Sequence, residues 1–257
     1  MIRRFLIGAA LAVTALVAIP AMSTSAMAED EAPLLNGNFT FDGPFGTFDI
    51  PAAQRGLQIY KEVCSNCHGL YELSYRNLEA LGYNKDQIKA FAGAYQVPDL
   101  NDDGEVIQRP ALASDKFVKP FPNEKAARAA NNGALPPDLA LIVRSREGGA
   151  NYVYSILQGY KDAPANFKMV DGTFYNTYFP GHQIKMPQPL QDGTVTFTDG
   201  SPNRLQDEAK DIVTFLAWAA EPELVERHRL GQHVMLFLFV LTGLLYYAKR
   251  RIWTDLH

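Results

Sequence analysis

The feature that most constrains this chain is a five-residue motif, Cys64-Ser65-Asn66-Cys67-His68, because it holds both cysteines of the 257 residues. Two cysteines at this spacing on a helical turn can both reach one edge of a flat ligand. C-x-x-C-H is the attachment pattern of c-type haem, in which the cysteines form thioether bonds and the adjacent histidine becomes the proximal iron ligand. The sequence therefore predicts one covalent haem c, bound through Cys64 and Cys67 and ligated by His68.

A C-x-x-C pair also occurs in zinc sites, in thiol–disulfide redox sites and as a disulfide. A structural zinc site needs four ligands, and the chain has no second cysteine pair to complete one. A thioredoxin-like redox site needs a βαβ unit around the cysteines, which the sequence pattern lacks. The histidine directly after Cys67 therefore favours haem over these alternatives.

Two apolar segments predict an exported, membrane-anchored protein. Residues 1–28 have a basic start, an apolar stretch and the sequence Ala-Met-Ala before position 29, as in a cleaved signal peptide; an uncleaved N-terminal anchor is the alternative. Residues 230–248 are apolar over 19 positions, close to the ~20 that a helix needs to cross a ~30 Å hydrocarbon core. The basic residues that follow place the tail, residues 249–257, in the cytoplasm.

Residues 29–229 are then expected to form a single domain on the periplasmic side of a bacterial inner membrane. A mitochondrial intermembrane space is the alternative compartment. The domain is acidic, with 27 Asp and Glu against 19 Lys and Arg. This charge argues against nucleic acid as a partner and favours a basic protein. Part of the charge lies in a run that is expected to be an exposed loop: Asp99, Asp102, Asp103 and Glu105.

Hydrophobic periodicity and the positions of glycine and proline predict a mainly helical domain with long loops. The expected helices cover residues 54–63, 85–95, 124–131, 139–146, 150–159 and 204–220. Residues 97–122 and 161–199 are rich in proline and glycine and are expected to be mostly loop. No strong run of strands is expected.

A second iron ligand has few candidates in the exported domain. Its methionines are Met169 and Met186, and its histidines besides His68 are His182 and His228. Met186 stands beside two prolines, which restrain the backbone around a ligand, so we rank it first, followed by His182 and then Met169. Ligation by histidine and methionine raises the reduction potential, which is typical of an electron carrier.

Four motifs occur in an order that resembles the cytochrome c1 family, the haem c subunit of the ubiquinol–cytochrome c reductase (cytochrome bc1) complex. They are VCSNCHGL, KAARAANNGALPPDLALIVRSREGGANYVYSILQGY, FYNTYFPGHQIKMPQPL and AKDIVTFLAWAAEPE. The resemblance covers the exported domain and the C-terminal helix. It implies a mainly α fold, namely a cytochrome c-type haem domain with long loop insertions and one C-terminal transmembrane helix.

The resemblance also implies site residues outside the haem motif. Met186 joins His68 as an iron ligand. The segment from Asn131 to Pro137 lines the haem. Arg146 meets a haem propionate, with Arg144 close enough in the sequence to be the alternative.

The function implied by the resemblance is electron transfer. The chain would accept an electron from the Rieske iron–sulfur protein and pass it to a soluble, basic c-type cytochrome, beside cytochrome b and membrane lipid. Ubiquinol oxidation coupled to proton translocation would belong to the complex, because this chain alone carries no bond-making chemistry. The alternatives are a membrane-anchored haem c subunit of a terminal oxidase, and a haem sensor or peroxidase-like enzyme with an open iron site.

Overall fold

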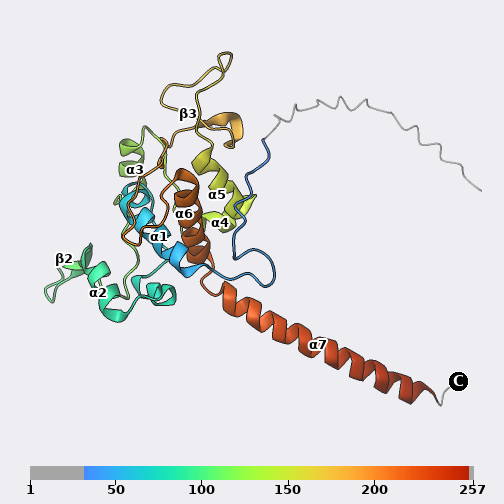
Figure 1. Cartoon of the computed structure of the whole chain (residues 1–257). Coiled ribbons are helices and arrows are strands. Elements are labelled where there is room, and N and C mark those ends of the chain that lie inside the picture. The colour runs from blue at the N-terminus through green and yellow to red at the C-terminus, as the bar shows by residue number, and fades with distance from the viewer. Residues whose placement is uncertain (1–31, 255–257) are drawn as a thin grey trace, which may run out of the picture. The chain divides into compact units, whose positions relative to one another are not determined.

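The computed structural model describes residues 32–254, and the predicted signal peptide lies outside them. The described part is mainly helical, as expected (Figure 1). The α-helices are α1 (Ile50–Glu62), α2 (Lys85–Gly93), α3 (Glu124–Ala130), α4 (Ile142–Ser145), α5 (Gly149–Gln158), α6 (Leu205–Ala220) and α7 (Leu224–Trp253). The 3-10 helices are η1 (Cys64–Asn66), η2 (Tyr75–Leu81) and η3 (Pro180–His182). The strands are β1 (Gln96–Leu100), β2 (Val106–Pro110), β3 (Phe174–Tyr175) and β4 (Gln183–Ile184).

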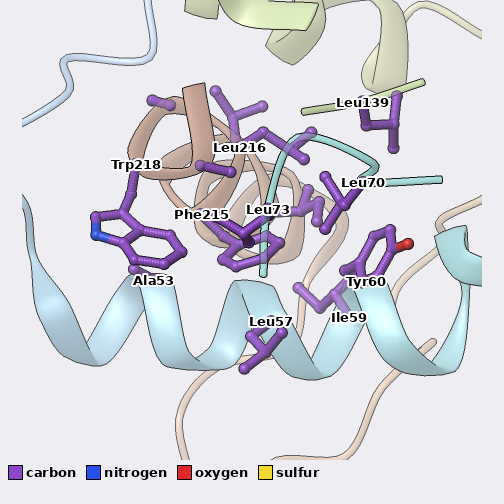
Figure 2. Packing of buried hydrophobic residues seen from close by; sticks show 14 of the residues in the cluster. Ala53, Leu57, Ile59, Tyr60, Leu70, Leu73, Leu139, Phe215, Leu216 and Trp218 are labelled. Carbon is purple, nitrogen blue, oxygen red and sulfur yellow. The ribbon is translucent and has the colours of Figure 1, made fainter. Parts of the chain in front are cut away.

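The core forms where α1 crosses α6, two helices far apart in the sequence. Figure 2 shows Ala53 and Tyr60 of α1 on the side that faces Trp218 and Phe215 of α6, and all four residues are buried. A Cβ added to Gly56 would lie 2.2 Å from the carbonyl oxygen of Asp211 on α6. The missing side chain at Gly56 is therefore what lets the two helix backbones approach this closely.

A buried ion pair joins the same two helices. The guanidinium of Arg55 donates to both carboxylate oxygens of Asp211, with N···O distances of 2.6 and 2.9 Å. Asp211 is only 5 % exposed, and its burial raises the pKa of its carboxyl group, while Arg55 acts in the opposite direction. The pair fixes how α1 and α6 lie along one another, since a two-point contact restricts sliding.

The expectation of loop for residues 97–122 is wrong in part, because β1 and β2 form an antiparallel hairpin from Gln96↔Pro110 to Leu100↔Val106. An isolated two-stranded ladder has only edge strands, which tolerate proline. Asp99 accordingly lies on β1, where it pairs with Arg109 of β2, and not in a loop. Residues 161–199 contain only the short β3, β4 and η3 and are otherwise irregular, as expected.

The helix expected over residues 139–146 is shorter than predicted. Only Ile142–Ser145 is α-helical, and α5 begins at Gly149 after a chain reversal. Gly148 and Gly149 both have positive φ, at 79° and 53°, a conformation that glycine adopts without strain. Both helices expected here are therefore present, and the first of them is only four residues long.

The C-terminal helix α7 contains the whole predicted membrane segment, residues 230–248. Among the described residues it is the one helix long and apolar enough to cross a membrane. Its large apolar side chains are exposed, as expected for a lipid-facing helix and not for a core helix: Met235, Leu236, Phe237, Phe239, Leu244 and Leu245. The structure thus agrees with a single-pass C-terminal anchor.

Candidate functional site

The cysteine motif is a helical turn that continues from α1. The backbone N–H groups of Cys67 and His68 both donate to the carbonyl of Cys64, at 3.1 and 2.9 Å. Cys64 is half-buried and packs against the core, whereas Cys67 is exposed, and neither is in a disulfide. Two free thiols on one turn are what thioether attachment to one porphyrin edge requires.

The ring of His68 has one nitrogen engaged and one available. Nδ1 lies 2.7 Å from the carbonyl oxygen of Pro137, which can only accept, so Nδ1 carries the proton and Nε2 keeps its lone pair. Burial lowers the pKa of His68, and the bond to Pro137 opposes this shift. The imidazole is thus held neutral and oriented, which is the form that binds a metal ion.

Two hydrogen bonds that the sequence did not reveal fix the backbone around His68. The hydroxyl of Tyr60 donates to the His68 carbonyl at 3.0 Å. The carboxylate of Asp138 accepts the N–H of Tyr71 at 2.9 Å, and a Cβ on Gly69 would lie 2.8 Å from the same carboxylate. The spacing of about two helical turns between Tyr60 and His68 was the only feature of the local sequence that could have indicated the first of these bonds.

The segment from Asn131 to Pro137 has contacts with His68 and with the residue before Met186. It begins where the Asn131 side chain ends α3 by donating to the Ala127 carbonyl at 2.7 Å. Its far end supplies the Pro137 carbonyl to His68. In between, the carbonyl of Asn132 accepts a hydrogen bond from the ammonium group of Lys185, the residue before Met186, at 3.1 Å. The segment therefore connects the neighbourhoods of His68 and Met186.

Met186 is half-buried and its backbone is fixed from two directions. Its carbonyl accepts a hydrogen bond from the hydroxyl of Tyr160 at 3.0 Å, across 26 positions of the chain. Tyr160 follows α5 directly, so this bond ties the long irregular segment to the helical core. Lys185 is exposed, and its ammonium group attaches the neighbouring position to Asn132. Sequence reasoning missed Tyr160, because no local pattern pairs it with Met186.

The other two ligand candidates lie in different settings. The ring of His182 stacks on Tyr175 at 5.5 Å between centroids, and its Nδ1 is 3.3 Å from the carbonyl of Asn176. His182 also has a positive φ of 56°, at the end of η3. Met169 is half-buried in the irregular segment before β3. His182 is therefore part of a local aromatic cluster.

The two arginines that could meet a propionate differ in their partners. Arg144 pairs with Glu221, with an N···O distance of 3.3 Å. Arg146 is exposed and makes no ion pair with any residue between 32 and 254. Arg146 is thus the arginine whose charge is still available to an incoming carboxylate.

The donors fit a haem c better than the alternatives. Burial raises the pKa of the Cys64 thiol to about 12, so this thiol lacks the lowered pKa that is typical of a redox-active dithiol. Nowhere in the described residues do three or more His, Cys, Asp or Glu side chains gather as metal ligands. Two thiols and a neutral, oriented imidazole remain, and this is the donor set of covalent haem attachment.

The chain is similar to known proteins along most of its length. A model of the Cytochrome C1 family matches residues 39–256. "Cytochrome c1" of Rhodospirillum rubrum is 44% identical over 85% of this chain and 86% of its own length. "Cytochrome c1-2, heme protein, mitochondrial" of Solanum tuberosum is 43% identical over 83% of each protein. "Cytochrome b/c1" of Bradyrhizobium diazoefficiens is 46% identical over 85% of this chain, but the match spans only 35% of that longer protein. The chain therefore belongs to the cytochrome c1 family.

Proposed function

We propose that this chain is the haem c electron-transfer subunit of a cytochrome bc1 complex. It accepts one electron from the Rieske iron–sulfur protein and passes it to a soluble c-type cytochrome. Cytochrome b is its neighbour in the membrane. The haem supplies the one-electron redox change, and the protein binds, orients and shields it. The observation that carries the proposal is the joining of three sequence-distant segments at the haem motif, through His68 with Pro137 and Asn132 with Lys185.

Each site residue has a defined task in this proposal. Cys64 and Cys67 form the two thioether bonds. His68 and Met186 ligate the iron, and the Pro137 carbonyl orients the imidazole. The segment from Asn131 to Pro137 covers the haem.

Arg146 neutralises a propionate, since a partly buried carboxylate is stabilised by a nearby guanidinium. The task falls to Arg146 and not to Arg144, because Arg144 is already paired with Glu221. This assignment is supported by the free guanidinium of Arg146 among the described residues.

The domain lies on the periplasmic side of a bacterial inner membrane in this proposal. Its support is the basic end of α7, where Lys249, Arg250 and Arg251 follow the apolar segment. The terminal-oxidase alternative has no specific observation in its favour.

The experiment that tests the proposal is the substitution Met186→Leu, with Met169→Leu as the matched control. Met186→Leu is expected to leave the haem attached and to lower its reduction potential by more than ~59 mV, which is a tenfold change for one electron. The near-infrared charge-transfer band of methionine-ligated ferric haem should disappear. Met169→Leu should keep both properties. A wild-type potential and band in Met186→Leu would contradict the ligand assignment and bring His182 forward.

A further inference from the structure

An exposed aromatic side chain lies beside the start of the membrane helix. Phe45 is 75% exposed, at the tip of the loop from Asp42 to Gly46, here called the Phe45 loop. This loop belongs to the N-terminal arm of the domain and is far from α7 in the sequence. No task in electron transfer uses it.

Two hydrogen bonds attach the Phe45 loop to α7. Nδ1 of His228 lies 3.0 Å from the carbonyl oxygen of Gly46, and the side-chain amide of Gln232 donates to the carbonyl of Pro44 at 3.4 Å. His228 and Gln232 are four residues apart and therefore lie on one face of the helix. The two carbonyls flank Phe45, so its position along α7 is fixed between these two turns.

The Phe45 loop is tightly packed at its end, Gly46. A Cβ on Gly46 would lie 2.2 Å from the carbonyl oxygen of Phe41, so only glycine fits there. On the inner side, Phe41 and Phe48 are buried in the core with ring centroids 5.4 Å apart. Phe45 is thus the aromatic residue of this arm that the fold leaves outside.

The length of α7 sets the level of the membrane surface. The uncharged segment 234–248 has 15 residues, or ~22 Å of helix, which is shorter than a ~30 Å hydrocarbon core. Extending the segment back to Leu230 gives 19 residues and ~28 Å. Gln232 therefore lies at the hydrocarbon boundary, and the Pro44 carbonyl bonded to it lies there as well.

We propose that the Phe45 loop is a second membrane contact, with the Phe45 ring inserted into the lipid interface beside α7. Aromatic rings concentrate at this level of a bilayer. Asp42, at the start of the loop, is its one charged residue, and residues 43–46 carry no charged side chain that insertion would have to desolvate. A loop anchored at the lipid surface restricts tilting of the haem domain on its single helix. The inference depends on α7 crossing the membrane and is independent of the haem ligands.

The test is photo-crosslinking of the full haem-loaded chain in its own membranes. A p-benzoylphenylalanine at position 45 is expected to give adducts with phospholipid after irradiation, detected by mass spectrometry. The same group at the equally exposed Val106, on β2, should give none. At Leu238, inside the apolar segment of α7, it should give lipid adducts as a positive control. These results together support the proposal.

Other outcomes overturn it. Adducts between position 45 and a protein would mean that the loop docks on another subunit, and the absence of any adduct would mean that it faces water. A failure at Leu238 would show that α7 does not cross the bilayer and would remove the basis of the loop contact.

A second measurement covers the case in which the photoreactive group disturbs the loop. In Phe45→Trp, made in a Trp253→Phe background, the remaining native tryptophan is Trp218, which is buried in the core. In phosphatidylcholine vesicles, lipids with brominated acyl chains are expected to quench the fluorescence of the tryptophan at position 45 by about twofold or more. Unchanged emission would contradict insertion.

Discussion

At the scale of single residues, the candidate site depends on side chains that do not bind the cofactor. Met186 has no helix or long strand of its own. Its position is set by the hydrogen bond from Tyr160 to its carbonyl and by the bond from the neighbouring Lys185 to the carbonyl of Asn132. Such bonds matter because a thioether is a weak ligand whose binding depends on where the backbone holds it. Tyr160 is therefore the residue through which α5 positions the methionine.

Removing the Tyr160 hydroxyl is expected to weaken the proposed ligation by Met186 and leave the fold intact. A net hydrogen bond contributes ~0.5–1.5 kcal/mol, and 1.36 kcal/mol corresponds to about one pH unit in a proton-linked equilibrium. The methionine–haem band is lost when the pH is raised far enough for another ligand to displace the methionine. In Tyr160→Phe, the midpoint pH of this loss should therefore fall by ~0.4–1 unit. Tyr175→Phe is the control, since the Tyr175 ring stacks on His182 and the hydrogen bond to the Met186 carbonyl comes from Tyr160. An unchanged midpoint in Tyr160→Phe would show that the bond does not position the ligand.

A second single residue, Glu208, introduces a pH dependence into the core. It is fully buried on α6, one of its carboxylate oxygens accepts the N–H of Val195 at 2.8 Å, and the other has no partner among the described residues. Burial raises the pKa of Glu208 above its ordinary 4.5. The folded state then holds a proton that the unfolded state releases, so the contribution of Glu208 to stability falls as pH rises through the raised pKa.

Glu208→Gln should remove this contribution. The free energy of unfolding, measured in denaturant at pH 5 and pH 8, is expected to decrease less between these values in the variant than in the wild type. The exposed Glu79→Gln should keep the wild-type difference. Equal differences in all three proteins would show that the Glu208 carboxyl titrates normally.

At the scale of elements, the crossing of α1 and α6 is the contact on which the haem motif rests, because α1 leads directly into Cys64. Helical periodicity predicted both helices. The role of Gly56 could not be predicted, since the atoms that exclude a side chain there belong to Asp211 and Phe215, about 155 positions later in the chain. The sequence places a glycine in a helix but does not say what comes close to it.

Gly56→Ala is expected to force the two helices apart. Overpacking typically costs ~1–3 kcal/mol, and we expect the upper end because one contact is with backbone. Gly93→Ala, at the end of α2 with nothing within 4 Å of an added Cβ, should instead be neutral or stabilise by up to ~1 kcal/mol. Urea unfolding of the haem-loaded domain measures both. A neutral Gly56→Ala would mean that the crossing can relax.

The β1–β2 hairpin lies where the sequence predicted mostly loop, over residues 97–122. Pro98, Gly104 and Pro110 are typical of loops, and the sequence predicted one. In the structure the prolines lie in edge strands, while Gly104 has a φ of 81° in the turn. The pairing is stabilised by Arg109, which contacts both Asp99 and Asp115. A cross-strand ion pair of this kind is not visible from composition alone.

At the scale of the whole molecule, the long-range contacts of the site were beyond sequence reasoning, although its residue types were not. The motif predicted Cys64, Cys67 and His68 as a unit because they are adjacent. The contact from His68 to Pro137 spans 69 positions, and that from Lys185 to Asn132 spans 53. Only the resemblance to a family indicated that these segments belong together, and the folded chain supplies the physical contacts.

The net negative charge of residues 29–229 leads to a prediction about a protein partner. Complementary charge raises association rates by ~10–10³-fold, and salt screens it, with a Debye length that falls from ~30 Å at about 10 mM to ~8 Å at about 150 mM. Electron-transfer encounters use small, short-lived interfaces, so steering affects their rate strongly. The second-order rate constant for reduction of a basic soluble cytochrome c should therefore fall by about tenfold or more over this range. A flat profile would exclude electrostatic steering.

The hairpin turn is the first place to look for the carboxylates that steer this encounter. Asp99 is already paired with Arg109, which leaves three exposed acidic residues at the turn: Asp102, Asp103 and Glu105. Neutralising these three as Asn, Asn and Gln is expected to reduce the salt dependence of the rate constant if the partner approaches over the hairpin. Asp162→Asn with Asp171→Asn, in the irregular segment after α5, is the comparison for a change in net charge alone. An equal effect for each charge removed in the two sets would mean that the partner responds to the overall charge. An unchanged slope in the turn variant would place the steering carboxylates elsewhere on the domain.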